Sequence, residues 1–139
     1  MEPKNEDLLK DFDSNEGVST EIFRKSESEL GCKFPPDYVE FMLACNGGEG
    51  FIGHQYVILW RAEELAEFNR EYEVGEYAPG LTLFGSNGGG EAFAFDTRND
   101  KMSVCMLPFI GMSRSPVKEL ADGFSGFIYF LWTSDEDLF

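Results

Sequence analysis

The sequence predicts an α+β fold, in which helices pack on one face of an antiparallel sheet meander. Two observations carry this prediction. Three strand-like segments follow one another with short turns between them, and short turns join antiparallel neighbours: Leu81–Phe84, Glu91–Asp96 and Ser103–Leu107. Around them, four segments repeat apolar residues at intervals of three and four, which is the spacing of a helix face. The predicted order is helix, helix, strand, helix, three strands and helix.

Two helices are predicted before the first strand. Ser19 or Thr20 can cap a helix over residues 20–30, and Gly31 can end it. Pro36 suits the first position of a second helix, which runs to about Cys45 and stops at Asn46-Gly47-Gly48. The residues expected to face the core are Ile22, Phe23 and Leu30 of the first helix and Tyr38, Phe41, Met42 and Cys45 of the second.

The remaining segments follow from composition and spacing. Gly50–Gly53 is predicted to be a loop and Tyr56–Trp60 a strand. Arg61–Tyr72 is predicted to be a helix, and Asn99-Asp100-Lys101 has the composition of a turn. Ser115-Pro116 is predicted to start a last helix that runs to Leu131. Further residues expected in or near the core are Leu65, Phe68 and Tyr72 of the third helix, and Trp60 and Trp132.

Length and composition indicate one folded domain. Residues 1–18 are polar and are predicted to form a flexible arm, residues 19–133 a single domain, and residues 134–139 an acidic tail. Hydrophobic residues make up 42% of the 139 positions and aromatic residues 15%, which is enough for a core and argues against a disordered chain.

The charge of the chain limits its partners. Against 11 basic residues stand 26 acidic ones, for a net charge of -15. Such a charge repels nucleic-acid phosphates and anionic membrane surfaces. It favours a basic protein partner, and it equally serves to keep the chain in solution. Composition leaves both explanations open, and it leaves the oligomeric state open as well.

Candidate catalytic and metal-binding groups are sparse. Cys32, Cys45 and Cys105 are widely spaced and form neither a disulfide framework nor a zinc motif. His54 is the only histidine, so a hydrolytic triad would depend on it alone. We therefore expect no catalytic residues, no metal and no cofactor. The polar start of the chain and its longest apolar run, Phe127–Trp132, predict neither a signal peptide nor a membrane span, and we expect a cytoplasmic protein.

A glycine-rich corner lies between the strands that end at Phe84 and begin at Glu91. Four glycines in six positions, from Gly85 to Gly90, supply backbone conformations with positive φ. A phosphate-binding loop would continue with Lys-Ser or Lys-Thr into a helix, whereas here Glu91 and a strand follow. The corner is therefore predicted to be a tight turn. Asp96, at the end of the second strand, is expected to bind backbone amides of the next turn.

Candidate partner-binding residues lie in two loops and on one helix. In the loops, carboxylates and amides stand beside glycines, where they can meet a cationic partner. On the helix, Glu63/Glu67 and Glu67/Glu71 are repulsive pairs, which a chain can retain to steer a basic partner. A merely solvated surface remains the alternative for each residue. The candidates are Asn46, Glu49, Glu63, Glu64, Glu67, Glu71, Ser86, Asn87 and Glu91.

Three motifs together resemble the SUKH superfamily. Leu30–Phe41 with the turn at Asn46-Gly47-Gly48 is similar to its opening, except that Phe34 stands where leucine is usual. Leu83–Asp96 resembles its second signature, and Leu107–Gly111 with the closing helix its third. The resemblance covers about residues 19–132. The residues that hold these motifs are Pro35, Tyr38, Gly47, Gly85, Gly90, Asp96 and Pro108.

The resemblance implies a non-catalytic binding function. Founding members of the superfamily include a fungal cell-wall assembly regulator, and many bacterial members are immunity proteins that neutralise toxins, often nucleases. It therefore implies an immunity protein that binds a basic toxin domain. The alternative that it leaves open is a regulatory scaffold module that binds an endogenous protein.

Overall fold

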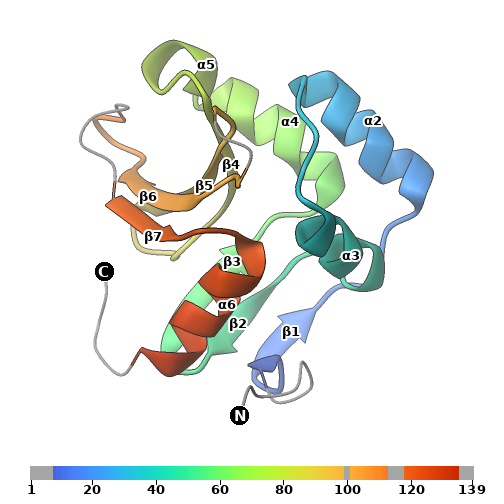
Figure 1. Ribbon diagram of the computed structural model, residues 1–139, viewed down its shortest axis with the longest axis vertical. Coiled ribbons are helices and arrows are strands. Elements are labelled where there is room, and N and C mark those ends of the chain that lie inside the picture. Colours follow the sequence, from blue (N-terminus) through green and yellow to red (C-terminus); the bar gives the residue numbers. More distant parts are fainter. Residues whose placement is uncertain (1–7, 99–100, 113–117, 135–139) are drawn as a thin grey trace.

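The computed structural model describes residues 8–98, 101–112 and 118–134 (Figure 1). Within these residues the chain forms strands and helices in mixed order. The strands are β1 (Phe12–Ser14), β2 (Gly48–Ile52), β3 (Gln55–Leu59), β4 (Leu81–Ser86), β5 (Glu91–Asp96), β6 (Val104–Pro108) and β7 (Lys118–Ala121). The helices are α2 (Thr20–Leu30), α3 (Pro36–Ala44), α4 (Ala62–Glu71), α5 (Val74–Tyr77) and α6 (Phe124–Thr133).

The described strands form one antiparallel meander, which confirms the predicted fold class. Each strand pairs with the next one along the chain, from β1 to β7. The β3–β4 pairing is short, because only Ile58↔Ser86 and Leu59↔Gly85 are in register. Figure 1 shows the consequence: β1–β3 and β4–β7 form two differently oriented parts of the sheet, and α6 lies against β2.

An aromatic layer forms the centre of the core. The ring of Tyr38 is 5.0 Å from those of Phe34, Phe95 and Phe124, measured between centroids. Phe84 of β4 stacks on Phe95 of β5 at 4.4 Å. Helices α3 and α6 therefore cover the sheet face that carries these rings. Among the described residues, no group forms a hydrogen bond with Tyr38 Oη, and burial raises the pKa of this phenol above its usual range.

The first two helices match their predicted bounds closely. Ser19 Oγ accepts a hydrogen bond from the Ile22 N–H at 3.2 Å, and Gly31 ends α2 with φ +73°. Pro36 opens α3, and Tyr38 and Met42 are buried as expected. Ile22 corrects one prediction, because 42% of its surface is exposed. Phe23, the next residue along the helix, faces the core as predicted.

The predicted loop at Gly50–Gly53 is wrong, since Gly48–Ile52 is strand β2. The glycines favoured a loop prediction, but in the structure they allow the backbones of two strands to approach closely. Gly48 and Gly50 have φ +146° and +144°, and a Cβ atom on either would lie within 2.6 Å of a backbone oxygen of residue 13 or 11. The neighbouring strand β1 lies within the predicted N-terminal arm and buries Phe12 against the core.

The predicted helix from Ser115-Pro116 to Leu131 is confirmed from Phe124 onward and is wrong at residues 118–121. Lys118–Ala121 is strand β7, and the helix begins only at Phe124. The apolar spacing of this segment fits both structures, and pairing with β6 through Cys105↔Glu119 and Met106↔Lys118 decides for the strand. Ser115-Pro116 itself and the turn residues Asn99-Asp100 lie outside the described residues.

Candidate partner-binding surface

Asn46 ties the first glycine loop to the start of helix α4. Its Oδ1 accepts a hydrogen bond from the Ala62 N–H at 2.8 Å, and its Nδ2 donates to Glu63 Oε1 at 2.7 Å. Only 6% of Asn46 is exposed. The amide thus satisfies an N-terminal N–H of the helix, in the manner of a cap. Two of the predicted binding residues, Asn46 and Glu63, are brought together, and they bind each other.

The acidic face of α4 divides into engaged and unengaged carboxylates. Glu64 Oε1 accepts a hydrogen bond from the Arg61 N–H at 3.0 Å, so this carboxylate satisfies the backbone N–H of the N-cap residue. Glu67 and Glu71 are exposed and make no hydrogen bond or ion pair with any other residue that the structure describes. Their charges are therefore available to a partner, whereas Glu63 and Glu64 also hold the helix end.

Glu49 lies on β2 in a row with the glycine hairpin. The pairs Glu49↔Ile58 and Ile58↔Ser86 place it two strands away from Ser86. The Tyr56 hydroxyl donates a hydrogen bond to the Glu49 carboxylate, and this interaction raises the pKa of Tyr56. Phe51, 49% exposed, packs on Tyr56 with ring centroids 5.2 Å apart. Exposed aromatic surface therefore accompanies the carboxylate on this face.

The glycine corner is the hairpin between β4 and β5. Asn87 Oδ1 accepts hydrogen bonds from the N–H groups of Gly89 and Glu91, at 2.8 and 3.1 Å. Ser86 is buried, and its Oγ accepts from the Gly88 N–H at 3.2 Å. These side chains hold the turn, while Gly88 and Gly90 have positive φ values of +76° and +107°. Glu91 is half-buried at the start of β5.

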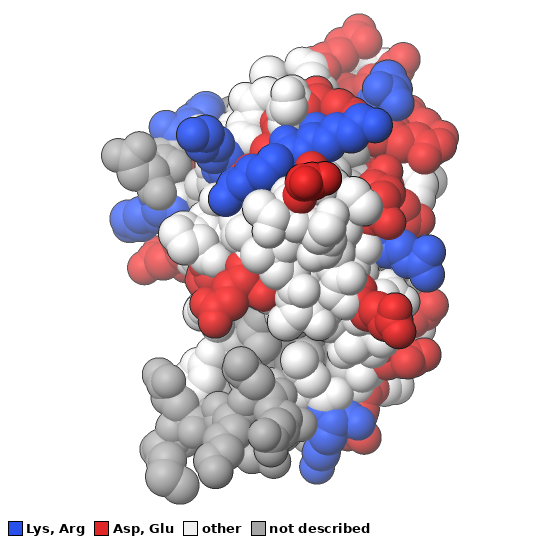
Figure 2. Space-filling model, turned by 90° about the vertical axis from the view of Figure 1, so that its right-hand side faces the viewer, with Lys and Arg blue, Asp and Glu red and all other residues white. Residues whose placement is uncertain are grey.

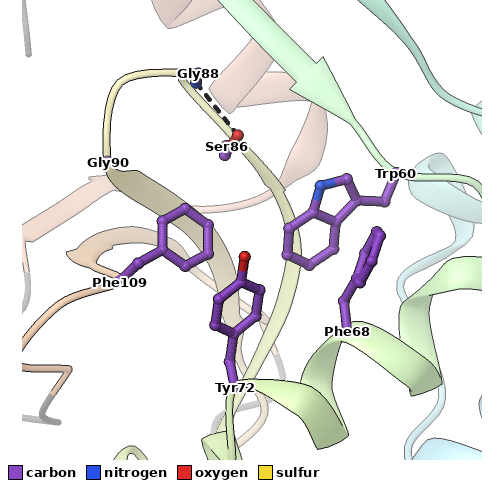
Figure 3. Close-up of a pocket in the computed structure, with 7 residues that line it drawn as sticks. All are labelled: Trp60, Phe68, Tyr72, Ser86, Gly88, Gly90 and Phe109. Carbon is purple, nitrogen blue, oxygen red and sulfur yellow. Dashed lines mark hydrogen bonds between the residues drawn. The ribbon is translucent and has the colours of Figure 1, made fainter.

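A pocket beside this hairpin brings together residues that the sequence analysis did not connect (Figure 3). Its volume is 210 Å³. Four aromatic rings line it, those of Trp60, Phe68, Tyr72 and Phe109, together with Ser86, Gly88 and Gly90 of the hairpin. We expected Trp60, Phe68 and Tyr72 in or near the core. The four-residue spacing of Phe68 and Tyr72 was the available signal, but Phe109 is brought to them only by the sheet.

The exposure of the rings shows how the pocket is built. Trp60 is buried, with 7% of its surface exposed, whereas 41% of Tyr72 is exposed at the rim. The Trp60 and Tyr72 rings are nearly parallel, with an angle of 11° and centroids 6.5 Å apart. Phe109 is 4.6 Å from Tyr72 and 6.5 Å from Trp60. Figure 3 shows the Tyr72 hydroxyl directed into the space between Phe109 and Trp60.

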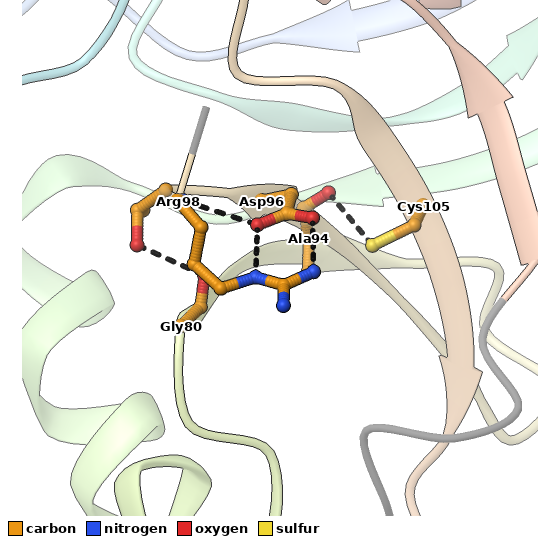
Figure 4. A network of polar contacts seen from close by, with 6 residues as sticks. Gly80, Ala94, Asp96, Arg98 and Cys105 are labelled. Carbon is orange, nitrogen blue, oxygen red and sulfur yellow. Dashed lines mark hydrogen bonds and ion pairs between the residues drawn. The ribbon is translucent and has the colours of Figure 1, made fainter. Parts of the chain in front are cut away.

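Asp96 holds the start of the turn that follows β5 (Figure 4). Its Oδ1 accepts a hydrogen bond from the Arg98 N–H at 3.1 Å, and its carboxylate pairs with the Arg98 guanidinium. Next to it, Thr97 Oγ1 donates to the Gly80 carbonyl at 2.9 Å. Cys105 Sγ donates to the Ala94 carbonyl nearby, and burial raises the pKa of this thiol to about 12. This network joins strands and offers no open reactive group.

The negative charge is not spread evenly over the surface. Figure 2 shows the face on the right-hand side of Figure 1, where Lys and Arg side chains gather near one end and acidic side chains line one margin. On α2, Arg24 forms an ion pair with Glu27. Helix α4 also exposes Arg70, but its carboxylates Glu67 and Glu71 form no ion pair with any residue that the structure describes.

Two features of the described residues bear on other functions. No group of three or more His, Cys, Asp or Glu side chains in residues 8–98, 101–112 and 118–134 is arranged to hold a metal ion. Among the helices in those same ranges, none has both the length and the apolar character that crossing a bilayer requires.

The fold and this surface define the class of the protein: it is a SUKH-type α+β domain whose exposed carboxylates and aromatic rings suit protein binding. The chain belongs to the SMI1 / KNR4 family (SUKH-1), whose model matches residues 17–129. It is also 33% identical over 99 residues to the uncharacterized protein YnaB of Bacillus subtilis (strain 168). That match covers 71% of this chain, which spans 64% of the relative's length. Membership confirms the resemblance that the three motifs indicated.

Proposed function

We propose that this protein is an immunity protein, which binds a basic toxin domain in the cytoplasm and neutralises it by covering its surface. The observation that carries the proposal is a row of unengaged carboxylates, Glu67 and Glu71, on an exposed helix of a SUKH-1 family member. Many nucleases are basic where they meet nucleic acid, so an inhibitor with a net charge of -15 attracts them. No catalytic residue is needed for such a role.

The contact surface that we propose combines α4 with the segment Asn46–Glu49 and the hairpin Ser86–Glu91. Glu67 and Glu71 supply attraction, since both are exposed and unpaired among the described residues. Glu49 adds charge from β2, beside the exposed rings of Phe51 and Tyr56. The hairpin at Ser86–Glu91 gives shape, because Asn87 and Ser86 fix its backbone. Charges arranged in this way speed encounter with a basic protein more than they tighten the final complex.

The direct test is protection of a cell. A toxin domain encoded beside the gene for this protein is expressed from an inducible promoter, with and without this protein in the same cell. We expect growth to be restored only when both are present, and the purified pair to form a stable complex that lacks the toxin's activity. Absence of both protection and complex for every toxin domain encoded there would contradict the proposal.

The same experiment separates immunity from a regulatory role. A scaffold module binds a protein of its own cell and leaves toxin activity unchanged. Recovery of a complex with an endogenous signalling or envelope protein, together with no protection against the toxin, would therefore favour the scaffold function.

A further inference from the structure

We propose that the aromatic pocket beside the glycine hairpin receives an arginine side chain of the protein partner. The inference deepens the proposed function and rests on it, because the basic partner supplies the arginine. The pocket lies between β4, the end of α4 and the segment after β6 (Figure 3). Its volume of 210 Å³ accommodates one long side chain.

The walls of the pocket suit a guanidinium group. The rings of Trp60, Tyr72 and Phe109 lie within 38° of a common orientation and surround the space. Arginine stacks its planar guanidinium on such rings, and its three methylene groups pack on apolar surface. Tyr72 Oη points into the space and can accept a hydrogen bond from an entering N–H group, whereas Ser86 Oγ is directed at the Gly88 N–H of the hairpin.

Carboxylates border the same stripe of α4. Side chains three and four residues apart are neighbours on a helix, so Glu64 and Glu71 lie beside Phe68. Glu67, the residue before Phe68, is exposed on the outer face of the helix. Arg61 lies three residues before Glu64 and Arg70 three residues after Glu67, so each of these two carboxylates has a basic neighbour on the helix, whereas Glu71 has none. A cationic side chain therefore approaches through a negative field, which an apolar side chain would not feel.

A purely apolar anchor is the competing occupant. Aromatic pockets often receive a leucine or phenylalanine, and burial of apolar area alone would hold it. Three features favour arginine: the nearly parallel faces of Trp60 and Tyr72, the Tyr72 hydroxyl as an acceptor in the space, and the Glu71 carboxylate beside Phe68 on α4. Phe109 is half-buried and Tyr72 is 41% exposed, so this side of the pocket is in contact with water, in which a charged head group can remain partly hydrated.

The test uses short blocked peptides as probes. The ¹⁵N-labelled full chain is titrated with acetyl-Gly-X-Gly-amide, in which X is arginine, lysine, citrulline or norleucine, at about 0.15 M salt to screen non-specific attraction. The signals followed are the Trp60 indole N–H and the amides of Gly88 and Gly90. We expect saturable shifts at these positions with the arginine peptide, and binding of the citrulline peptide about tenfold weaker, since it has the same shape without the charge.

The other peptides decide between the two occupants. Lysine carries the same charge but no planar group, and we expect it to bind more weakly than arginine. Equal or tighter binding of the norleucine peptide would overturn the proposal in favour of an apolar anchor. Equal binding of lysine and arginine, or arginine shifts scattered over the acidic surface without saturation at the pocket, would overturn it as well.

Variants link the signals to the pocket. Tyr72→Leu keeps apolar bulk and removes the π face, and we expect about fivefold weaker binding of the arginine peptide. Tyr77→Leu is the matched control, because Tyr77 is 50% exposed on α5 and does not line the pocket. Equal affinities of both variants would overturn the assignment. Toxin protection without peptide binding would reject the arginine pocket and leave the proposed function intact. Peptide binding without protection would reject the proposed function and leave the pocket's preference for arginine intact.

Discussion

The side-chain amide of Asn69 takes the place of a strand beside Leu83. Asn69 Oδ1 accepts a hydrogen bond from the Leu83 N–H at 2.8 Å, and Asn69 Nδ2 donates to the Leu83 carbonyl at 3.0 Å. Strand β3 pairs with β4 only at Gly85 and Ser86, so it does not reach Leu83. The amide therefore satisfies buried groups that the sheet leaves open, and it fixes α4, with the proposed contact surface, to β4.

Replacement of Asn69 is expected to be costly. Asn69→Leu keeps the apolar volume and leaves the Leu83 N–H and carbonyl without partners, so we expect a loss of about 2–4 kcal/mol in the free energy of unfolding. The measurement is urea denaturation followed by tryptophan fluorescence. Arg70→Ala, an exposed change at the next position, should stay within about 0.5 kcal/mol of the parent. A loss below about 1 kcal/mol for Asn69→Leu would contradict the role of the amide.

Removal of the buried hydroxyl of Tyr38 is expected to stabilise the fold. Tyr38 is 1% exposed, and no described group accepts or donates a hydrogen bond at its Oη. Tyr38→Phe removes an unsatisfied polar atom and keeps the ring contacts, so we expect a gain of about 1 kcal/mol in the free energy of unfolding. Tyr56→Phe is the control, because its hydroxyl binds Glu49 at the surface and its loss should bring no gain. A clear loss for Tyr38→Phe would mean that the hydroxyl has a partner.

The glycines of the hairpin are expected to differ in their tolerance of a side chain. A Cβ atom on Gly85 would lie 2.4 Å from the Ile58 carbonyl oxygen, whereas one on Gly89 would meet nothing closer than 3.6 Å and needs no positive φ. Gly85→Ala should therefore cost about 2 kcal/mol or more, while Gly89→Ala should be neutral or slightly stabilising. Thermal and urea unfolding measure both. Similar effects of the two changes would show that the hairpin and β3 can move apart.

Stability is expected to fall at alkaline pH. Burial raises the pKa of Cys105 to about 12, so the folded state keeps a proton that the unfolded thiol loses near pH 8.5. The stabilisation is complete below that pH and is lost as the pH rises from about 8.5 towards 12. Cys32 and Cys45 contribute with the same sign, because burial raises the pKa of each.

Urea midpoints between about pH 7 and 10 test this dependence, in the range before free tyrosine ionises. Cys105→Ala lowers stability at every pH through the lost packing. The quantity compared is therefore the slope of the urea midpoint against pH. We expect a shallower decline for Cys105→Ala than for the parent chain. An unchanged slope would assign the decline to other groups.

Charge reversal on α4 is expected to slow association with the toxin domain. Glu67→Lys with Glu71→Lys alters the outer face without touching the helix cap, and should lower the association rate about tenfold at low salt. Glu119→Lys with Asp122→Lys is the matched control, since both residues are exposed near the other edge of the sheet and the net charge changes equally. Stopped-flow or surface-based kinetics at two salt concentrations measure both. Equal slowing by the two pairs would assign steering to net charge alone.

The sequence by itself determined the α+β class, the family, and most helices and strands before residue 97. Local signals sufficed there: Ser19 and Gly31 bound α2, Pro36 opens α3, and the glycines after Phe84 allow only a tight turn. These features act within a few residues, so they can be read along the chain. The acidic face of α4 was visible for the same reason.

Only the tertiary structure decided the rest, because the deciding contacts join distant residues. Glycines in β2 look like a loop until β1 lies against them, and residues 118–121 become a strand only through pairing with β6. Asn46 is an exposed loop amide in sequence terms, but the fold buries it against α4. The pocket needs Phe109 beside Tyr72, 37 positions apart in the numbering and 4.6 Å apart between ring centroids. No local pattern encodes such a contact, since it depends on how the sheet places one turn next to one helix.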